Sequence, residues 1–409
     1  MNDYHHTSFQ PHRARCLVLT GDVLESLDGV RVIANRAAPR SAGLEWSKWL
    51  ASHGAHVTVA GPGVKKLLHG QARIELAQCV DASTHSLIEL IETLPGPYDY
   101  AFQLARVPSL RPRRSFLHKI KAKEAGAYLD LDVFPNESPF EALSARWPTF
   151  GYDRAGVLRY EGSETLESKS VLDGLSALGV TSAQIPFEYA PAITVPDLKG
   201  RHIVITSGPT AEPLSAAKDV LTNFSSGRQG MSIAWILALC GAQVSLISGP
   251  AYVSFPADPR IDVRLVESSE SMLSAVEDSL PADGFVAVAA VADFRAENPL
   301  QQLLNAPASV RLRPTPDILA NVGYARSRPQ AVIGFAAETA DLEVYARRKL
   351  FAKGADVILA NKVGAARRVS DSSLNQVLEV SAKHSFWHPL EAKAQVGLRV
   401  AHILSRLLK

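Results

Sequence analysis

The fold of this chain is decided by the stretch His202-Ile203-Val204-Ile205-Thr206-Ser207-Gly208-Pro209-Thr210, in which a β-branched run leads into a turn of small residues. The run is typical of a short buried strand. Further on, Asn223-Phe224-Ser225-Ser226-Gly227-Arg228-Gln229-Gly230 precedes an apolar segment, Met231–Cys240, which indicates a buried helix. A Ser/Gly loop that opens a helix directs backbone N–H groups and the positive end of the helix dipole at one point, as phosphate sites do. Taken alone, the loop is equally consistent with an ordinary turn that holds no ligand.

Composition limits the class of protein. The chain has 409 residues, a formal net charge of +2 and 46% hydrophobic residues, which is typical of a globular protein of two or three domains and gives no case for nucleic acid or a membrane. The apolar run Phe285–Val291 is too short to span a bilayer. The N-terminus lacks a signal pattern, and the scattered cysteines Cys16, Cys79 and Cys240 fit buried thiols, so we expect a cytoplasmic protein.

The chain repeats its own motifs at a spacing of roughly 187 residues, which predicts a tandem duplicated domain. The pairs are Cys16–Thr20 with Ile203–Thr206, Leu27–Arg36 with Lys218–Phe224, Gly54–Pro62 with Gly241–Pro250, and Val80–Ser83 with Val266–Ser269. Beyond Pro108 the match weakens. There we expect the first copy to lack counterparts of Pro316–Leu319 and Gly334–Thr339, and we match Lys119 and Lys123 to Lys349 and Lys353.

Strand-like and helical segments alternate in both copies, which predicts an α/β fold: a Rossmann-like three-layer sandwich with a mostly parallel sheet, present twice. We expect a first domain over 1–184, a Pro- and Ala-rich linker over 185–200 and a second domain over 201–409. The rule that ligands bind at the carboxyl ends of parallel strands then places a site at Thr206–Thr210.

The second half resembles the phosphopantothenate–cysteine ligase family, also called phosphopantothenoylcysteine synthetase, over about residues 198–405. The resemblance depends on blocks in the family's order rather than on any one of them. These are Leu198-Lys199-Gly200, Thr206–Pro213, Asn223–Gly227, Ala289–Phe294, Pro316–Leu319, Gly334–Thr339, Lys349-Leu350 with Lys353, and Ala360-Asn361. The first half is similar to the same domain more faintly.

The resemblance implies a coenzyme A biosynthesis type of ligase that joins a carboxylic acid to an amine through an acyl-nucleotidylate. It implies CTP, which we favour over ATP, with Mg²⁺ held by the phosphates and not by side chains. The residues that it implies for the nucleotide are Gly208, Thr210, Ser225, Ser226, Gly227, Gly230, Ala290, Asp293, Pro316, Asp317, Ile318, Leu319 and Phe335. The catalytic candidates are Asn223, Lys349, Lys353 and Arg31, with Asn223 bonded to the acyl-nucleotidylate.

Most of these residues also have a structural interpretation. Without the family context Phe335 would be read as core, and Lys349 and Lys353 as a solvated helix face. Asn223 could be a turn residue. In the first copy Pro39 stands where the second has Gly227, which removes an N–H donor and argues against a triphosphate there.

Two departures from the family pattern are complementary. The stretch Pro299–Pro307, where the family has a lysine-rich flap, contains no lysine, and the Val-Arg-x-x-x-Asn pattern is intact only in the first copy, as Val30-Arg31 with Asn35. We hypothesise that the two copies of one chain form an internal pseudo-dimer with a composite site. The chain itself would be a monomer or a homodimer. The first copy would then offer Arg31, with Asn35, Lys119, Lys121 and Lys123 as candidate substrate contacts.

We therefore predict a nucleotide-dependent carboxylate–amine ligase with altered small-molecule substrates, phosphopantothenate and cysteine or analogues. The alternatives are a non-catalytic nucleotide-binding protein and a dinucleotide-dependent oxidoreductase. The second is disfavoured because neither first strand is followed by G-x-G-x-x-G.

Overall fold

The computed structural model describes residues 12–28, 30–36, 42–64, 73–116, 120, 129–155, 158–161, 196–251, 258–338, 341–362 and 374–409. We call the described residues up to 161 the first half and those from 196 onward the second half. The expected linker falls outside the described residues up to position 195. Among the described residues, no helix has the length and apolar character that a membrane crossing requires.

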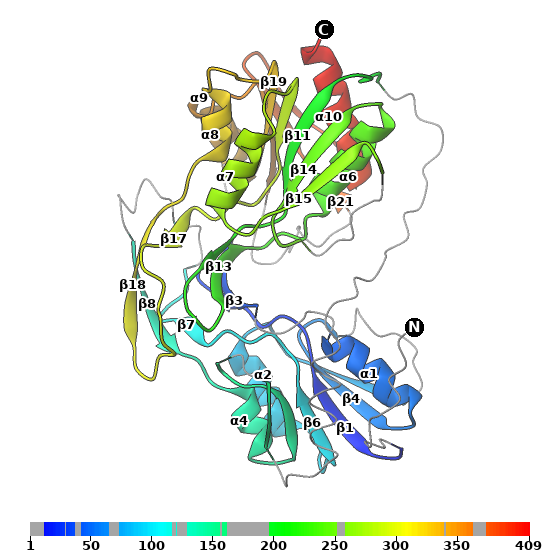
Figure 1. The fold of residues 1–409 in the computed structure, drawn as a ribbon, viewed down its shortest axis with the longest axis vertical. Coiled ribbons are helices and arrows are strands. Elements are labelled where there is room, and N and C mark those ends of the chain that lie inside the picture. The colour runs from blue at the N-terminus through cyan, green and yellow to red at the C-terminus, as the bar shows by residue number, and fades with distance from the viewer. Residues whose placement is uncertain are drawn as a thin grey trace.

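The first half alternates strands with helices (Figure 1). Its strands are β1 (Arg15–Leu19), β2 (Glu25–Ser26), β3 (Arg31–Asn35), β4 (His56–Gly61), β5 (Ile74–Gln78), β6 (Tyr100–Gln103), β7 (Leu110–Pro112), β8 (Leu129–Pro135), β9 (Thr149–Tyr152) and β10 (Leu158–Glu161). Its helices are α1 (Ala42–Ser52), α2 (Thr84–Thr93) and α4 (Pro139–Ser144).

The second half alternates in the same manner. Its strands are β11 (His202–Ser207), β12 (Ala211–Pro213), β13 (Asp219–Asn223), β14 (Gln243–Ser248), β15 (Ile261–Leu265), β16 (Gly284–Ala287), β17 (Phe294–Ala296), β18 (Ala308–Pro314), β19 (Ala331–Glu338), β20 (Val357–Lys362), β21 (Leu374–Asn375), β22 (Leu378–Ser381), β23 (Ser385–Trp387) and β24 (Glu391–Ala392). Its helices are α6 (Arg228–Leu239), α7 (Ser269–Asp278), α8 (Ile318–Gly323), α9 (Leu342–Ala352) and α10 (Lys393–Leu407).

Each half is built on a mainly parallel sheet. The first sheet has the order β10-β9-β6-β1-β4-β5, with only β10 antiparallel to its neighbour. The second has the order β15-β14-β11-β16-β19-β20-β22-β23, parallel from β15 to β20 and antiparallel beyond. The α/β fold with mostly parallel sheets that the sequence predicts is therefore confirmed.

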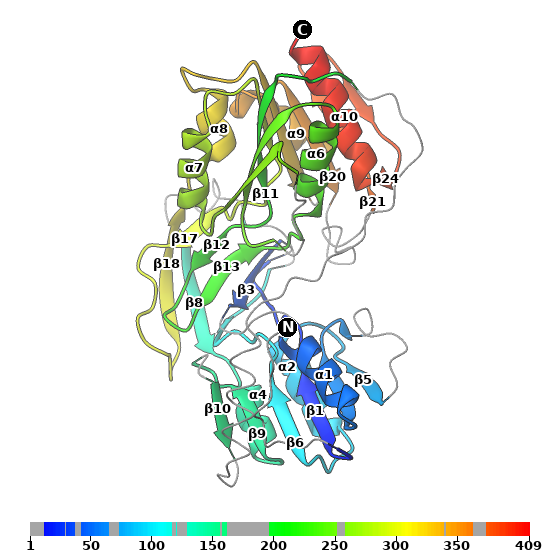
Figure 2. The ribbon, with the colours of Figure 1, turned by 45° about the vertical axis from the view of Figure 1, so that its right-hand side comes forward.

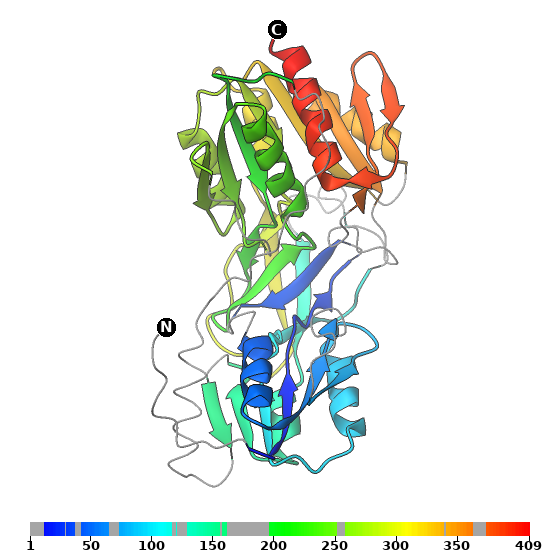
Figure 3. The ribbon, with the colours of Figure 1, turned by 90° about the vertical axis from the view of Figure 1, so that its right-hand side faces the viewer.

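Helices cover both faces of each sheet because alternate residues of a strand point to opposite sides. In β11, Ile203 and Ile205 pack with α6 and α10, whereas Val204 packs with α7 and α8. In β1, Cys16 and Val18 pack with α1, while Leu17 and Leu19 pack with α2 and α4 on the other face. Figure 3 shows α6 and α10 beside each other on one face of the second sheet. Each half is therefore a three-layer sandwich. Burial in the first of them raises the pKa of the Cys16 thiol to about 12.

The two halves are joined by two further four-stranded sheets (Figure 2). In one, ordered β12-β13-β3-β2, β3 of the first half runs antiparallel to β13 of the second. In the other, ordered β17-β18-β8-β7, β8 runs antiparallel to β18. Apolar residues of both halves, among them Ile33, Leu131, Leu221 and Leu312, bury one common cluster between these sheets. The halves therefore share hydrogen-bond ladders as well as a core.

The common topology gives a residue-by-residue match between the halves and corrects two expectations. An isolated β-bridge joins Asp22 to Arg106 in the first half, and another joins Pro209 to Ala290 in the second. In the same way, Gly151 of β9 pairs with β6, and Gly334 of β19 pairs with β16. Thus the first half does contain counterparts of the later blocks. Glu137-Ser138-Pro139 stands for Pro316-Asp317-Ile318, and Gly151-Tyr152 stands for Gly334-Phe335. The expectation that they are missing was wrong.

The second correction concerns the lysines. Lys119 and Lys123 precede β8 in the chain, whereas Lys349 and Lys353 follow β19, so the two pairs are not counterparts. Because β8 matches β18, the first-half segment between β7 and β8 corresponds instead to the stretch between β17 and β18. The strand order β5-β4-β1-β6-β9 of the first sheet matches β15-β14-β11-β16-β19 of the second, and the tandem duplication stays a prediction.

Candidate active site

The loop after β13 meets the end of β11 at the start of α6. Gly227 is the N-cap of α6 with a φ of 77°, a conformation that favours glycine. Gly230 packs so closely under β11 that a Cβ there would lie 2.3 Å from the Ser207 Oγ. The Ser207 hydroxyl in turn donates to the Gly227 carbonyl at 3.1 Å. The first turn of α6 contains no acidic side chain, so its backbone N–H groups and dipole suit an anion.

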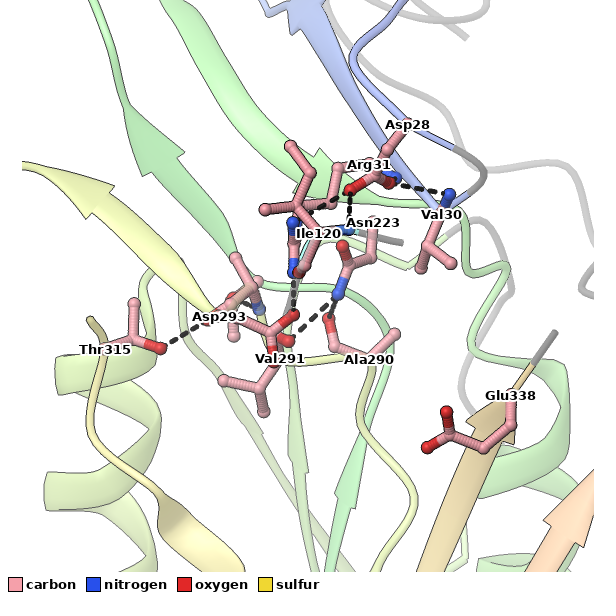
Figure 4. Close-up of polar contacts among 12 residues, drawn as sticks. Asp28, Val30, Arg31, Ile120, Asn223, Ala290, Val291, Asp293, Thr315 and Glu338 are labelled. Atoms are coloured by element: carbon pink, nitrogen blue, oxygen red, sulfur yellow. Dashed lines mark hydrogen bonds and ion pairs between the residues drawn. The ribbon is translucent and has the colours of Figure 1, made fainter. Parts of the chain in front are cut away.

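Arg31 of the first half reaches into the second half at this end of its sheet, which we call the site edge (Figure 4). Its guanidinium is fully buried and donates to the Asp28 carboxylate at 2.9 Å, to the Ile120 carbonyl at 2.8 Å and to the Asp293 carboxylate. Asp293 follows β16 in the chain, and its side chain keeps 33% exposure. A buried guanidinium needs such partners, because an unpaired charge in the interior is costly. The structure therefore brings two predicted site residues, Arg31 and Asp293, together from opposite halves.

Asn223 lies directly across the ladder from Arg31, its Cα partner in the pairing of β13 with β3. Its Nδ2 donates to the carbonyls of Ala290 at 3.2 Å and Val291 at 2.9 Å, as Figure 4 shows. These two acceptors fix the orientation of the amide. Its Oδ1 is buried and has no hydrogen-bond partner among the described residues. The atom that Asn223 can offer to a ligand is therefore an acceptor.

The remaining nucleotide candidates form the scaffold of the same edge. Thr210 accepts the Ala292 N–H at its hydroxyl at 2.9 Å, and Pro209 bridges Ala290, so the turn after β11 holds the loop after β16. Gly208 takes a φ of +70° beside the Gly249 carbonyl. The serines of the phosphate loop accept backbone N–H groups within it: Ser225 from Gly227, and Ser226 from Arg228.

The two candidate lysines are each held by a carboxylate. Lys349 on α9 pairs with Glu338 at 2.8 Å, and Lys353, the C-cap of α9, pairs with Asp317. Asp317 also caps α8 by accepting the Ala320 N–H at 3.1 Å. Ile318 is buried behind this cap with Leu319, while Phe335 is half-buried against the core of the second sheet. Sequence reasoning missed Glu338 and Asp28 as partners, although Glu338 lies inside the block Gly334–Thr339 and Asp28 inside the repeat motif Leu27–Arg36.

The position in the second half that matches Arg31 carries a different residue. Asp219 on β13 stands there in place of an arginine, opposite Asn35 of the first half, whose Nδ2 donates to it at 3.0 Å. The buried Asp219 carboxylate also accepts from the Ser109 N–H at 2.9 Å and from the hydroxyls of Ser109 and Ser215. Burial raises the pKa of Asp219, and the four donors act against that rise. Asn35 therefore lies at the other end of the β3·β13 ladder, away from Asn223.

Of the remaining candidates, Lys119, Lys121 and Lys123 lie outside the described residues. Ile120 between them is described. Its N–H donates to Asp28 at 3.1 Å, and its carbonyl accepts from Arg31.

Comparisons with known proteins show what the chain is similar to. The family model for the DNA/pantothenate metabolism flavoprotein C-terminal domain matches residues 12–146 and 198–407. The coenzyme A biosynthesis bifunctional protein CoaBC of Vibrio cholerae is 35% identical over 223 residues, which is 53% of this chain and 54% of that protein. The protein of the same name from Escherichia coli K12 is 37% identical over 216 residues, 50% of this chain and 51% of that protein. The chain spans about half the length of these relatives.

Two solved structures are also similar to part of the chain. The crystal structure of the C-terminal domain of CoaBC is 33% identical, covers 52% of this chain and 97% of that one, and has a TM-score of 0.44. A Cab2 mutant in complex with phosphopantothenate-cysteine is 17% identical, covers 51% of this chain and 88% of that one, and also has a TM-score of 0.44.

Proposed function

The chain belongs to the family of the DNA/pantothenate metabolism flavoprotein C-terminal domain, and we propose that it is a nucleotide-dependent carboxylate–amine ligase. In this reaction a carboxylate oxygen of the acid attacks the α-phosphorus of CTP or ATP, and pyrophosphate leaves. The amine nitrogen then attacks the acyl carbon, the nucleoside monophosphate leaves with the former carboxylate oxygen, and the amine releases a proton. The product is an amide.

The observation that carries this proposal is the arrangement of Arg31, Asp293 and Asn223 at one edge, beside the start of α6. The ladder between β3 and β13 fixes Arg31 and Asn223, and Arg31 holds Asp293, before any ligand arrives, so the site spends little free energy on ordering itself. Arg31 acts through Asp293: it neutralises and orients the carboxylate that we propose to contact the nucleoside. Arg31 is thus a positioning residue rather than one that touches phosphate.

The phosphate side of the site uses backbone groups. The N–H groups from Ser225 to Gly230 and the dipole of α6 would hold the triphosphate. We propose that Mg²⁺ would enter with the nucleotide and be held by its phosphate oxygens rather than by side chains. Bound there, it would neutralise phosphate charge. Lys349 and Lys353 stand paired with Glu338 and Asp317 and would have to exchange these carboxylates for phosphate.

The segment that replaces the expected flap is part of the framework. The Leu300 N–H donates to the Leu214 carbonyl at 2.8 Å, the Leu300 carbonyl accepts from Ala216 at 2.7 Å, and Leu300 and Leu304 pack on the shared core. The topologically matching segment of the first half contains Lys119, Lys121 and Lys123 in sequence around Ile120, which touches Arg31. We propose that these lysines supply the missing positive charge, which makes one composite site per chain in an internal pseudo-dimer.

We further propose that the acid and amine are small molecules of the phosphopantothenate and cysteine type, altered from that pair. The reason is that the flap and arginine changes alter the groups that would handle phosphate and substrate.

The test is pyrophosphate release with CTP and with ATP across a panel of acids, with mass detection of the acyl-nucleotide. Arg31→Lys and Lys121→Ala should lower turnover at least tenfold, whereas Lys199→Ala, an exposed lysine in the turn before β11, should leave it unchanged. Full turnover in both variants would refute the composite site. Tight CTP binding with no pyrophosphate released from CTP, whichever acid is added, would indicate a non-catalytic nucleotide-binding protein instead.

A further inference from the structure

Lys349, one of the two lysines that we assign to the phosphates, forms an ion pair with Glu338. The Lys349 Nζ lies 2.8 Å from the Glu338 Oε1. The Glu338 side chain is only 10% exposed, whereas that of Lys349 is 33% exposed. In the part of the chain that the structure describes, no second cation pairs with Glu338. The buried carboxylate therefore depends on Lys349 for its counter-charge.

Strand β19 places Glu338 at the site edge. The pairing of β19 with β16 ends at Gly334, opposite Ala287, and β19 continues to Glu338 along β20 alone. Four further residues of strand correspond to a length of about 13 Å. Glu338 thus lies beyond the end of β16, on the side where the loop that carries Asp293 leaves that strand (Figure 4). A phosphate that reaches Lys349 would therefore come close to this carboxylate.

One ammonium group would then have to serve two anions. If Lys349 leaves Glu338 for a phosphate, the carboxylate stays buried without its cation, which is costly. If Lys349 contacts both anions, they share its charge and repel each other across it. In both cases part of the attraction between Lys349 and the phosphate is lost. The ion pair with Glu338 therefore lowers the affinity of the site for phosphate.

The same competition acts on the product. Pyrophosphate has to leave the site in each turnover of the proposed ligase, and product release limits the rate of many enzymes. As pyrophosphate departs, Lys349 can return to Glu338 and compensate the buried carboxylate again. We propose that Glu338 is a positioning residue that competes with phosphate for Lys349, so that it weakens triphosphate binding and promotes the release of pyrophosphate. This inference rests on the proposed function, because it needs a polyphosphate at Lys349.

Glu338 can be replaced without disturbing a helix cap. Asp317, which pairs with Lys353, is also the N-cap of α8, so its replacement would alter that helix as well. Glu338 lies on a strand and caps no helix. A matched control is Glu343, which pairs with Arg347 of α9 at 3.3 Å but is 52% exposed and costs little when its charge is lost.

Calorimetric titration of the full chain with CTP, with ATP and with inorganic pyrophosphate, each with Mg²⁺ and without an acid substrate, tests the inference. We expect Glu338→Gln to bind pyrophosphate, and whichever nucleotide the unmodified chain binds, roughly tenfold more tightly. Glu338→Ala should shift both affinities in the same direction. Damage to the fold would weaken binding, so it cannot produce this result. Glu343→Gln should leave both affinities unchanged.

A double-mutant cycle shows whether the effect passes through Lys349. Lys349→Gln should weaken nucleotide binding, and in that background Glu338→Gln should change the affinity by less than about twofold. Weaker or unchanged binding in Glu338→Gln, or the same tightening with and without Lys349, would overturn the inference. If the unmodified chain binds neither CTP nor ATP, the proposed function itself fails, and the inference falls with it.

Discussion

Arg31 links the two halves, because its fully buried guanidinium forms ion pairs with Asp28 of its own half and with Asp293 of the other. Removing it would leave the Asp28 carboxylate buried without its cation. We expect Arg31→Leu to lower the free energy of unfolding by about 3 to 5 kcal/mol in urea denaturation. Arg264→Leu, which breaks an exposed ion pair with Asp262, should cost no more than about 1 kcal/mol. Equal losses in the two variants would contradict this account of Arg31.

At this scale the sequence predicted residue types better than partners. Arg31 and Asn223 were predicted from the motifs of the resemblance, and Asp293 also from its place after an apolar strand, which can be read locally. The contact of Arg31 with Asp293 was not predicted. It depends on the register of β3 against β13, which are far apart in the chain, and no local pattern specifies that register.

Helix α6, which follows the phosphate loop, depends on Gly230 as much as on the serines of that loop. In Gly230→Ala the new Cβ would lie 2.3 Å from the Ser207 Oγ, so α6 must move away from β11. We expect a loss of about 1 to 3 kcal/mol in stability, and at least tenfold weaker CTP or ATP binding by calorimetry. Gly43→Ala is the matched control, because its Cβ would lie 2.4 Å from the Thr20 Oγ1 in the first half. It should cost similar stability and leave nucleotide binding intact, and equal loss of binding in both variants would oppose the assignment of the loop.

A buried glutamate links strand β22 of the second sheet to helix α10. Glu379 on β22 accepts from His388 at 3.0 Å and from Arg406 at 2.9 Å. Burial acts to raise the pKa of Glu379, but these bonds outweigh it and hold the pKa below the ordinary 4.5. A carboxyl with a lowered folded pKa stabilises the fold above its unfolded pKa, and this stabilisation is lost as the pH falls through the folded pKa.

We therefore expect Glu379→Gln to lower the free energy of unfolding by about 1 to 3 kcal/mol at pH 7, with the difference from the unmodified chain shrinking below pH 4.5. Urea denaturation over a series of pH values measures it. Glu89→Gln, at an exposed pair with His85, should show a difference near zero throughout. A Glu379→Gln difference that stays constant down to pH 3 would rule out this linkage.

The whole molecule shows where sequence comparison of the two copies succeeds and where it fails. The four motif pairs up to Val80–Ser83 lie on matching elements because strands there keep the same spacing in both halves. Past Pro108 the loops differ in length, so a lysine pair alone could not show which strand it precedes. The pairing of β8 with β18 resolves this, because it specifies the order of elements independently of sequence.

Shared sheets also make the two halves one cooperative unit, which sets the last prediction. Leu221 on β13 is fully buried in the cluster that both halves build, so Leu221→Ala should cost about 2 to 5 kcal/mol. Since β13 belongs to the same ladder as β3, we expect the loss to appear in both halves. Hydrogen exchange followed by mass spectrometry should show faster exchange in β4 and in β14 to the same extent. The exposed substitution Val344→Ala should change neither strand, and faster exchange in only one of the two strands would mean that the halves unfold independently.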